Sequence, residues 1–136
     1  MPKLTSVHHL ALTVTDVERS VPWYERVLDL EESHRREDPE TGVAKVVLKS
    51  AGDSFAVVLV QHPDTERGAF DERRTGLDHV AFSVASKAEL SEWEQRLDDF
   101  GVSYRPATSR TFEGSSVLII RDPDGIQLEI WADPEL

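Results

Sequence analysis

The feature of this sequence that most constrains its fold is an internal repeat with an offset of 70 residues. The segment HHLALTV (8–14) aligns with DHVAFSV (78–84), which brings His9 into register with His79. Further along, VVLKSAGDSFAVVLV (46–60) aligns with SVLIIRDPDGIQLEI (116–130) at the same offset. A match that keeps one period over this length indicates two copies of one structural unit.

Each copy of the repeat predicts a strand, a helix and then three strands. The strand segments alternate apolar and polar residues, as half-buried strands do. In the second copy Ser86 and Glu89 form a capping box at the start of the helix, and Thr15 and Glu18 offer a similar box in the first copy. The element order β-α-β-β-β in each copy predicts an α+β fold made of two tandem βαβββ modules, with the helices packed on one side of sheet.

The repeat divides a single domain, residues 1–136, into two modules. The first module covers about 4–61 and the second covers about 77–132. The polar segment HPDTERGAFDERRTG (62–76) contains proline and glycine, so we expect it to connect the modules. A chain of this length can bury a core of its own.

Charge and composition exclude several classes of function. The formal net charge is −11, from 26 acidic and 15 basic residues, which opposes binding to nucleic acid or to an anionic membrane surface. The chain has no cysteine, which excludes disulfides, thiolate metal ligands and thiol nucleophiles. No apolar run approaches the ~18–20 residues that cross a bilayer. The N-terminal segment lacks the apolar stretch of a signal peptide, so we expect a cytoplasmic protein.

Strand alternation places three potential metal ligands on equivalent faces. The apolar row of the first strand is expected to pack on the helix, which leaves His9 on the opposite face, and the repeat puts His79 in the same position. In the last strand Glu129 alternates with an apolar row and takes this face as well. The residues expected on this face beside them are Ala11, Thr13, Gln127 and Trp131.

Two histidines and a carboxylate form the ligand set of divalent metal sites. Neutral imidazole and carboxylate supply lone pairs to Fe²⁺, Mn²⁺, Ni²⁺, Co²⁺ or Zn²⁺, and three protein ligands leave open positions for water or substrate. Taken singly, each of these residues is more often a polar residue with only a structural role. Their coincidence in the register of the repeat favours a metal site formed by His9, His79 and Glu129.

Three segments of the chain resemble a known superfamily. They are HHLALTVTDVERSVPWYERVLDL (8–30), GLDHVAFSV (76–84) and DPDGIQLEI (122–130), and together they are similar to the vicinal oxygen chelate group, which contains glyoxalases, bleomycin resistance proteins and extradiol dioxygenases. The resemblance implies paired βαβββ modules whose curved, U-shaped mixed sheets surround a metal-binding cavity. It also implies a homodimer, in which one metal site can combine modules of two chains.

The chain departs from the best-known reactions of this superfamily at identifiable positions. Leu59 is the counterpart of Glu129 at offset 70, where glyoxalase I carries an acidic ligand. Ile119 stands where extradiol dioxygenases carry a tyrosine, and Ala11 stands where fosfomycin resistance enzymes carry threonine or cysteine. We therefore expect neither glyoxalase I nor catechol dioxygenase activity.

The remaining residues predict a partly apolar cavity. Its expected lining, beyond the metal ligands, is Phe55, Val57, Leu59 and Gln61. Arg105, Arg110 and Arg121 are candidates to pair with a substrate carboxylate, or else ordinary surface arginines.

The candidate metal ligands and the resemblance to this superfamily together imply a metal-dependent enzyme, of lyase, isomerase or dioxygenase type. Its expected substrate is a small molecule that chelates the metal through two oxygens. The alternative is a protein of the same fold that only binds an antibiotic or metabolite.

Overall fold

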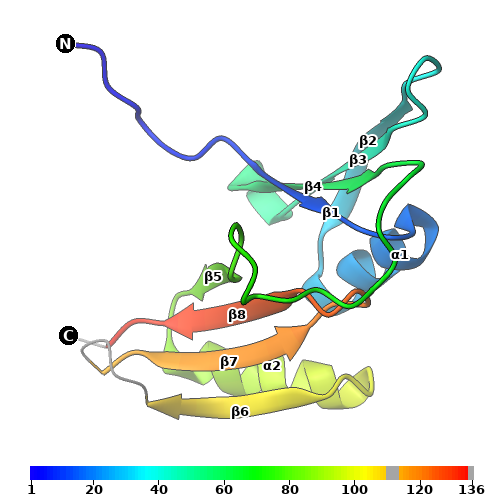
Figure 1. Cartoon of the computed structure of the whole chain (residues 1–136). Helices are drawn as coiled ribbons and strands as arrows, with labels where there is room; N and C mark the ends of the chain where they lie inside the picture. The colour runs from blue at the N-terminus through cyan, green and yellow to red at the C-terminus, as the bar shows by residue number, and fades with distance from the viewer. Residues whose placement is uncertain (110–113, 135–136) are drawn as a thin grey trace. The chain divides into compact units, whose positions relative to one another are not determined.

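A computed structural model describes residues 1–109 and 114–134 of the chain (Figure 1). The chain forms two compact units, Met1–Arg67 and Gly68–Leu136. Each unit contains one copy of the repeat, with one four-stranded sheet and one α-helix.

The first unit has a mixed sheet. Its elements are β1 (Leu10–Thr13), α1 (Val17–Leu28), β2 (Glu31–Glu37), β3 (Ala44–Lys49), the 3-10 turn η1 (Ala51–Asp53) and β4 (Ala56–Gln61). The strand order is β1-β4-β3-β2, with β1 parallel to β4 and the other neighbours antiparallel.

The second unit repeats this arrangement. Its elements are β5 (Val80–Val84), α2 (Lys87–Asp99), β6 (Tyr104–Ser109), β7 (Ser116–Arg121) and β8 (Gln127–Ala132). The strand order is β5-β8-β7-β6, and β5 is again parallel to the last strand. The predicted α+β fold of two tandem βαβββ modules with mixed sheets is therefore confirmed.

Both helices begin at a side chain that caps the first turn. The hydroxyl of Ser86 accepts a hydrogen bond from the backbone N–H of Glu89 at 3.3 Å, as expected for α2. At α1 the expectation of Thr15 as the cap is wrong, because the carboxylate of Asp16 accepts the bond from the backbone N–H of Glu18 at 2.9 Å. No helix within the described ranges is long and apolar enough to cross a membrane.

One face of each sheet packs on the helix of its own unit. In the first unit the buried side chains of this core include Leu12, Val14, Tyr24, Val27, Val46, Leu48, Val57 and Leu59. In the second unit they include Val80, Leu90, Leu97, Leu118, Ile120, Leu128 and Ile130. Each large aliphatic side chain buried in this way contributes roughly 1.5–3 kcal/mol relative to an exposed one. The opposite face of each sheet is left to carry the polar residues.

The strand register corrects the alignment of the last strand of each copy. Ala11 pairs with Val58 in the first sheet, and its counterpart Ala81 pairs with Glu129 in the second. Val58, and not Leu59, is therefore the counterpart of Glu129, at an offset of 71 rather than 70. Val58 is apolar as well, so this position still cannot supply an acidic metal ligand in addition to Glu129.

The offset has already changed before the last strand, because Val47, the partner of Val58, corresponds to Ile119, the partner of Glu129, at an offset of 72. Residues 50–55 connect β3 to β4 and residues 122–126 connect β7 to β8, so the first turn is longer by one residue and lowers the offset from 72 to 71. In the second turn the buried carboxylate of Asp122 accepts hydrogen bonds from the backbone N–H groups of Asp124 and Ile126, at 2.9 and 2.8 Å. These bonds fix where β8 begins, and with it the face on which each β8 side chain lies.

Candidate functional site

Glu129 lies at the centre of a polar cluster in the second unit. It is on β8 and only 6% exposed. Gln127 donates from Nε2 to Oε1 of Glu129 at 2.9 Å, and Trp131 donates from Nε1 to Oε2 at 2.6 Å. The three side chains share one face because residues two apart in a strand point the same way. The two bonds hold the carboxylate in one orientation and leave part of its acceptor capacity free.

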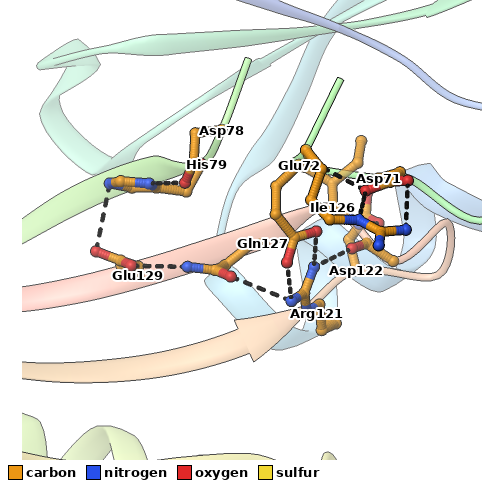
Figure 2. A network of polar contacts seen from close by, with 11 residues as sticks. Asp71, Glu72, Asp78, His79, Arg121, Asp122, Ile126, Gln127 and Glu129 are labelled. Carbon is orange, nitrogen blue, oxygen red and sulfur yellow. Dashed lines mark hydrogen bonds and ion pairs between the residues drawn. The ribbon is translucent and has the colours of Figure 1, made fainter. Parts of the chain in front are cut away.

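His79 precedes β5 and lies between two carboxylates. Its Nδ1 is 2.7 Å from Oδ1 of Asp78, and its Nε2 is 3.5 Å from Oε2 of Glu129 (Figure 2). Because an ionised carboxylate can only accept, the bond to Asp78 requires the proton on Nδ1. In the neutral ring Nε2 then carries a lone pair, and it faces a carboxylate oxygen.

His79 and Glu129 have the chemistry and the spacing of two ligands of one divalent ion. Imidazole nitrogen and carboxylate oxygen bind zinc and related ions at about 2.0–2.2 Å. Nε2 of His79 and Oε2 of Glu129 are 3.5 Å apart, so both atoms could reach one ion that lies between them. A hydrogen bond from the second ring nitrogen to a carboxylate is the usual support of a metal-bound histidine. The residues present therefore fit a metal ion.

A chain of hydrogen bonds links Gln127, the partner of Glu129, to Glu72 in the segment that connects the modules. The side-chain oxygen of Gln127 accepts from Nη2 of Arg121 at 3.1 Å. Arg121 donates through both Nη atoms to Glu72, at 2.9 and 3.1 Å, and to the carbonyl of Gly125 at 3.0 Å (Figure 2). The guanidinium lowers the pKa of Glu72 to about 2, and Glu72 raises the pKa of Arg121. Arg121 is thus engaged within the protein, which corrects its assignment as a candidate for binding a substrate carboxylate.

A pocket of about 370 Å³ lies on this face of the second sheet, and Glu129 is part of its lining. Ala81, Glu129, Ile119 and Arg105 form one row across β5, β8, β7 and β6, because each is the register partner of the next. The last three of these residues line the pocket. The row therefore has a buried carboxylate near one end, an exposed guanidinium at the other and an apolar side chain between them.

In the first unit the residues expected beside His9 keep the predicted face. Ala11 and Thr13 are exposed on β1, and half-buried Val58 is the register partner of Ala11. His9 is exposed just before β1, and its Nδ1 lies 2.9 Å from Nδ1 of His8. The strand alternation of β1 thus agrees with the sequence, although β1 itself begins only after His9.

The apolar residues of β4 that were expected to line the cavity lie on the other face of the sheet. Val57 and Leu59 are fully buried and pair with Leu10 and Leu12, on the face that packs on α1. Their assignment to the His9 face is therefore wrong, because the true register in β4 differs by one residue from the repeat alignment. Phe55 lies in the turn before β4 and is 39% exposed.

Gln61 has a structural contact that the sequence did not suggest. Its Oε1 accepts a hydrogen bond from the backbone N–H of Val17 at 2.8 Å. Val17 is the first residue of α1, so this bond satisfies one of the N–H groups that a helix leaves without an internal partner. The role expected for Gln61 in the cavity is corrected to that of a helix cap.

The predicted three-residue metal site divides between the two units. His9 belongs to the first unit, whereas His79 and Glu129 belong to the second. Each unit is described on its own, so ligation of the same ion by His9 stays a prediction. Among residues 1–109 and 114–134, no group of three or more histidine, aspartate and glutamate side chains is close enough to hold a metal ion. Arg110, the remaining arginine candidate, lies outside the described residues.

The residues that hold the candidate ligands in place were not predicted from the sequence. Asp78 stands directly before His79, and this Asp-His dipeptide was a readable signal. Gln127 was assigned to the correct face without a role. The ion pair of Glu72 with Arg121 joins residues that are 49 positions apart, and no local pattern in the sequence indicates it.

Comparison with related sequences points to one family. The model of the Glyoxalase/Bleomycin resistance protein/Dioxygenase superfamily matches residues 6–130. The uncharacterized protein YwkD of Bacillus subtilis is 29% identical, over 94% of this chain and 97% of its own length. The metallothiol transferase FosB of Bacillus licheniformis is 25% identical, over 94% of this chain and 75% of its own length.

Solved structures share the fold. A glyoxylase/bleomycin resistance protein/dioxygenase domain from Frankia sp. EAN1pec has a TM-score of 0.86 and 34% identity, and the match covers 97% of this chain and 100% of that chain. The fosfomycin resistance protein FosX from Listeria monocytogenes, complexed with Mn(II) and sulfate, has a TM-score of 0.68 and 17% identity, over 97% of this chain and 95% of that chain. The family match spans nearly the whole chain and both copies of the repeat, so the chain belongs to the Glyoxalase/Bleomycin resistance protein/Dioxygenase superfamily.

Proposed function

We propose that this protein is a divalent-metal-dependent enzyme that acts on a small, partly apolar substrate. His9, His79 and Glu129 are the proposed metal ligands. The substrate is proposed to bind the ion through two of its oxygens, in a reaction of lyase, isomerase or dioxygenase type.

The observation that carries this proposal is the approach of Nε2 of His79 to Oε2 of Glu129 at 3.5 Å. The Nδ1 proton is engaged by Asp78, so two acceptor atoms face one another unless a proton or a cation lies between them. The separation is longer than the roughly 2.7–2.9 Å of a charge-assisted hydrogen bond. It suits two atoms that share one metal ion.

The remaining residues of the cluster support a metal ion rather than a chemical step of their own. When bound, such an ion would act as a Lewis acid toward substrate oxygens. Gln127 and Trp131 orient the carboxylate of Glu129, and Asp78 orients the ring of His79. Ile119 gives the adjacent pocket of about 370 Å³ an apolar surface for the carbon part of a substrate.

The relatives agree with this class of chemistry. FosB is named a metallothiol transferase, and FosX was crystallised with Mn(II). The first is 25% identical to this chain and the second 17%, so neither supplies a substrate or a reaction. The metal requirement is the part of the proposal that they support.

The metal requirement is tested by titrating chelator-treated protein with Mn²⁺ and following the free ion by electron paramagnetic resonance. We expect one ion per chain, and at least tenfold weaker binding in the His79→Ala and Glu129→Gln variants. His62→Ala removes an exposed histidine after β4 and is the matched control. Equal binding by all four proteins, or none by the wild type, contradicts the proposal.

Catalysis and simple binding are distinguished by their products. We expect turnover of small oxygen-chelating substrates to stop when a chelator removes the metal and to return when metal is restored. A protein that only sequesters its ligand would keep binding it after chelation and would leave its mass unchanged.

We further propose that the protein is a homodimer whose metal sites use His9 of one chain with His79 and Glu129 of the other. Mixing the His9→Ala and His79→Ala variants tests this arrangement. In a mixed dimer one site would then have all of its ligands and would recover Mn²⁺ binding, whereas sites formed within one chain would not recover. A strict monomer in analytical ultracentrifugation also counts against shared sites.

A further inference from the structure

The second sheet carries a cation on the same face as Glu129. Arg105 is two strands away from Glu129, with Ile119 between them in the same register row. Neighbouring strands are about 4.8 Å apart, so the backbone positions of Arg105 and Glu129 are separated by roughly 10 Å. All three residues line the pocket of about 370 Å³.

Arg105 differs from Arg121, the other arginine of this pocket. Arg121 is held by Glu72, Gly125 and Gln127. Arg105 is exposed and makes no hydrogen bond or ion pair within the part of the chain that the structure describes. Its five N–H donors are therefore available to a ligand in the pocket.

The backbone directly after Arg105 is irregular. The pairing of β6 with β7 shifts between Arg105 and Thr108, where Pro106 interrupts the ladder. Such a bulge bends a strand and redirects its side chains, and bulges occur frequently beside active sites. β6 is the edge strand of its sheet, where the missing N–H of a proline can be tolerated.

We propose that Arg105 binds an anionic group of the substrate, of the carboxylate, phosphonate or phosphate class. This inference rests on the proposed function, because the other end of the same substrate would ligate the metal at His79 and Glu129. The substrate is then a short molecule with chelating oxygens at one end, an apolar middle over Ile119 and an anion at the other end. A planar guanidinium recognises such an anion through two parallel hydrogen bonds.

The charge of the pocket favours this ligand over a neutral one. The chain as a whole carries a formal charge of −11, which repels anions at long range. Locally, the charge of Glu129 is balanced by Arg105, and that of Arg121 by Glu72. A divalent ion bound at Glu129 would make the pocket positive and would attract an anionic substrate to this face.

Two matched probes test the inference, succinate and succinamate. Succinamate keeps one carboxylate for the metal and replaces the second with an uncharged amide. Binding of each probe is measured by calorimetry on metal-free and Zn²⁺-loaded protein, for the wild type, Arg105→Gln, Arg105→Lys and the control Arg67→Gln. Arg67 is an exposed arginine that does not belong to the lining of this pocket, so its substitution removes the same charge without changing that lining.

We expect the wild type to prefer succinate over succinamate about ten- to hundredfold, as a charge-assisted hydrogen-bonded pair allows. The preference disappears in Arg105→Gln, is reduced in Arg105→Lys and persists in Arg67→Gln. Inorganic phosphate, used as a third probe, should lose affinity in Arg105→Gln in the same way.

A succinate preference that survives Arg105→Gln, or one that is absent from the wild type, overturns the inference. Failure of the proposed function has a separate signature, which is the absence of Zn²⁺ binding in every variant. The titrations of metal-free protein then still report on Arg105 alone.

Discussion

Nδ1 of His79 donates a hydrogen bond to Oδ1 of Asp78 at 2.7 Å. This bond determines which ring nitrogen holds the proton and which is available to a metal ion. Asp78 is exposed and lies next to His79 in the chain, so it orients the imidazole without any contribution from the core.

Replacing Asp78 should weaken metal binding without unfolding the protein. We expect Asp78→Ala to lower the affinity for Mn²⁺ about ten- to hundredfold, the usual effect of removing the partner of a metal-bound histidine. Asp78→Asn keeps a side-chain acceptor and should retain more of the affinity. Asp64→Ala, at another exposed aspartate, is the control, and equal Mn²⁺ affinity in all three variants would show that Asp78 has no such role.

The pair of Glu72 and Arg121 predicts a pH-dependent contribution to stability. Arg121 lowers the pKa of Glu72 from an ordinary value of 4.5 to about 2. A lowered pKa in the folded state stabilises the protein above the unfolded pKa, and this contribution is lost as the pH falls from about 4.5 to about 2.

Glu72→Gln removes this contribution. We expect a lower melting temperature than that of the wild type at pH 7, and a difference that shrinks as the pH falls below about 4.5. Thermal unfolding followed by circular dichroism across this range is the measurement. A difference that stays constant with pH would mean that the carboxylate charge of Glu72 does not stabilise the fold.

Gln61→Ala should destabilise the fold and leave the metal site intact. The backbone N–H of Val17 loses its acceptor, which costs about 1–3 kcal/mol of the free energy of unfolding when the group is buried. Gln61→Glu restores an acceptor and places a negative charge at the start of α1, so we expect it to recover stability. Urea denaturation measures both effects. Weaker Mn²⁺ binding in Gln61→Ala without a loss of stability would indicate that Gln61 lines the metal-binding cavity instead.

A pair of glutamate substitutions tests the strand register of β4. Leu59→Glu places a charge in the core against α1 and should cost more than about 3 kcal/mol, or prevent folding. Val58→Glu places the same charge on the half-buried opposite face, where we expect a cost of about 1 kcal/mol or less. The milder pair Leu59→Thr and Val58→Thr provides the comparison if the first variant does not fold. Equal losses within a pair would contradict the register.

The repeat and the strand alternation were sufficient to predict the fold. The β-α-β-β-β order, the face of Ala11 and Thr13, and the common face of Gln127, Glu129 and Trp131 all follow from residue spacing alone. These features are local, because a period of two in a strand depends only on backbone geometry.

The constant offset of 70 fails in both β3 and β4, but it assigns side chains to the wrong face only in β4, where the deviation is one residue rather than two. An offset of 70 holds between Ala11 and Ala81, but it is 72 between Val47 and Ile119 and 71 between Val58 and Glu129. A shift of one residue moves every side chain of a strand to the other face, which is why Val57 and Leu59 were assigned incorrectly.

The sequence by itself determined the two βαβββ modules and the chemical types of the candidate ligands. Tertiary structure alone decided which polar residues are already engaged: Arg121 with Glu72, Gln61 with Val17, and Glu129 with Gln127 and Trp131. The physical reason is that a side chain's hydrogen-bonding capacity belongs to its residue type, whereas the partner that uses it is chosen by the distances that the folded chain creates. That is why the structure distinguishes Arg105, with donors available in a pocket, from Arg121, whose donors hold the protein together.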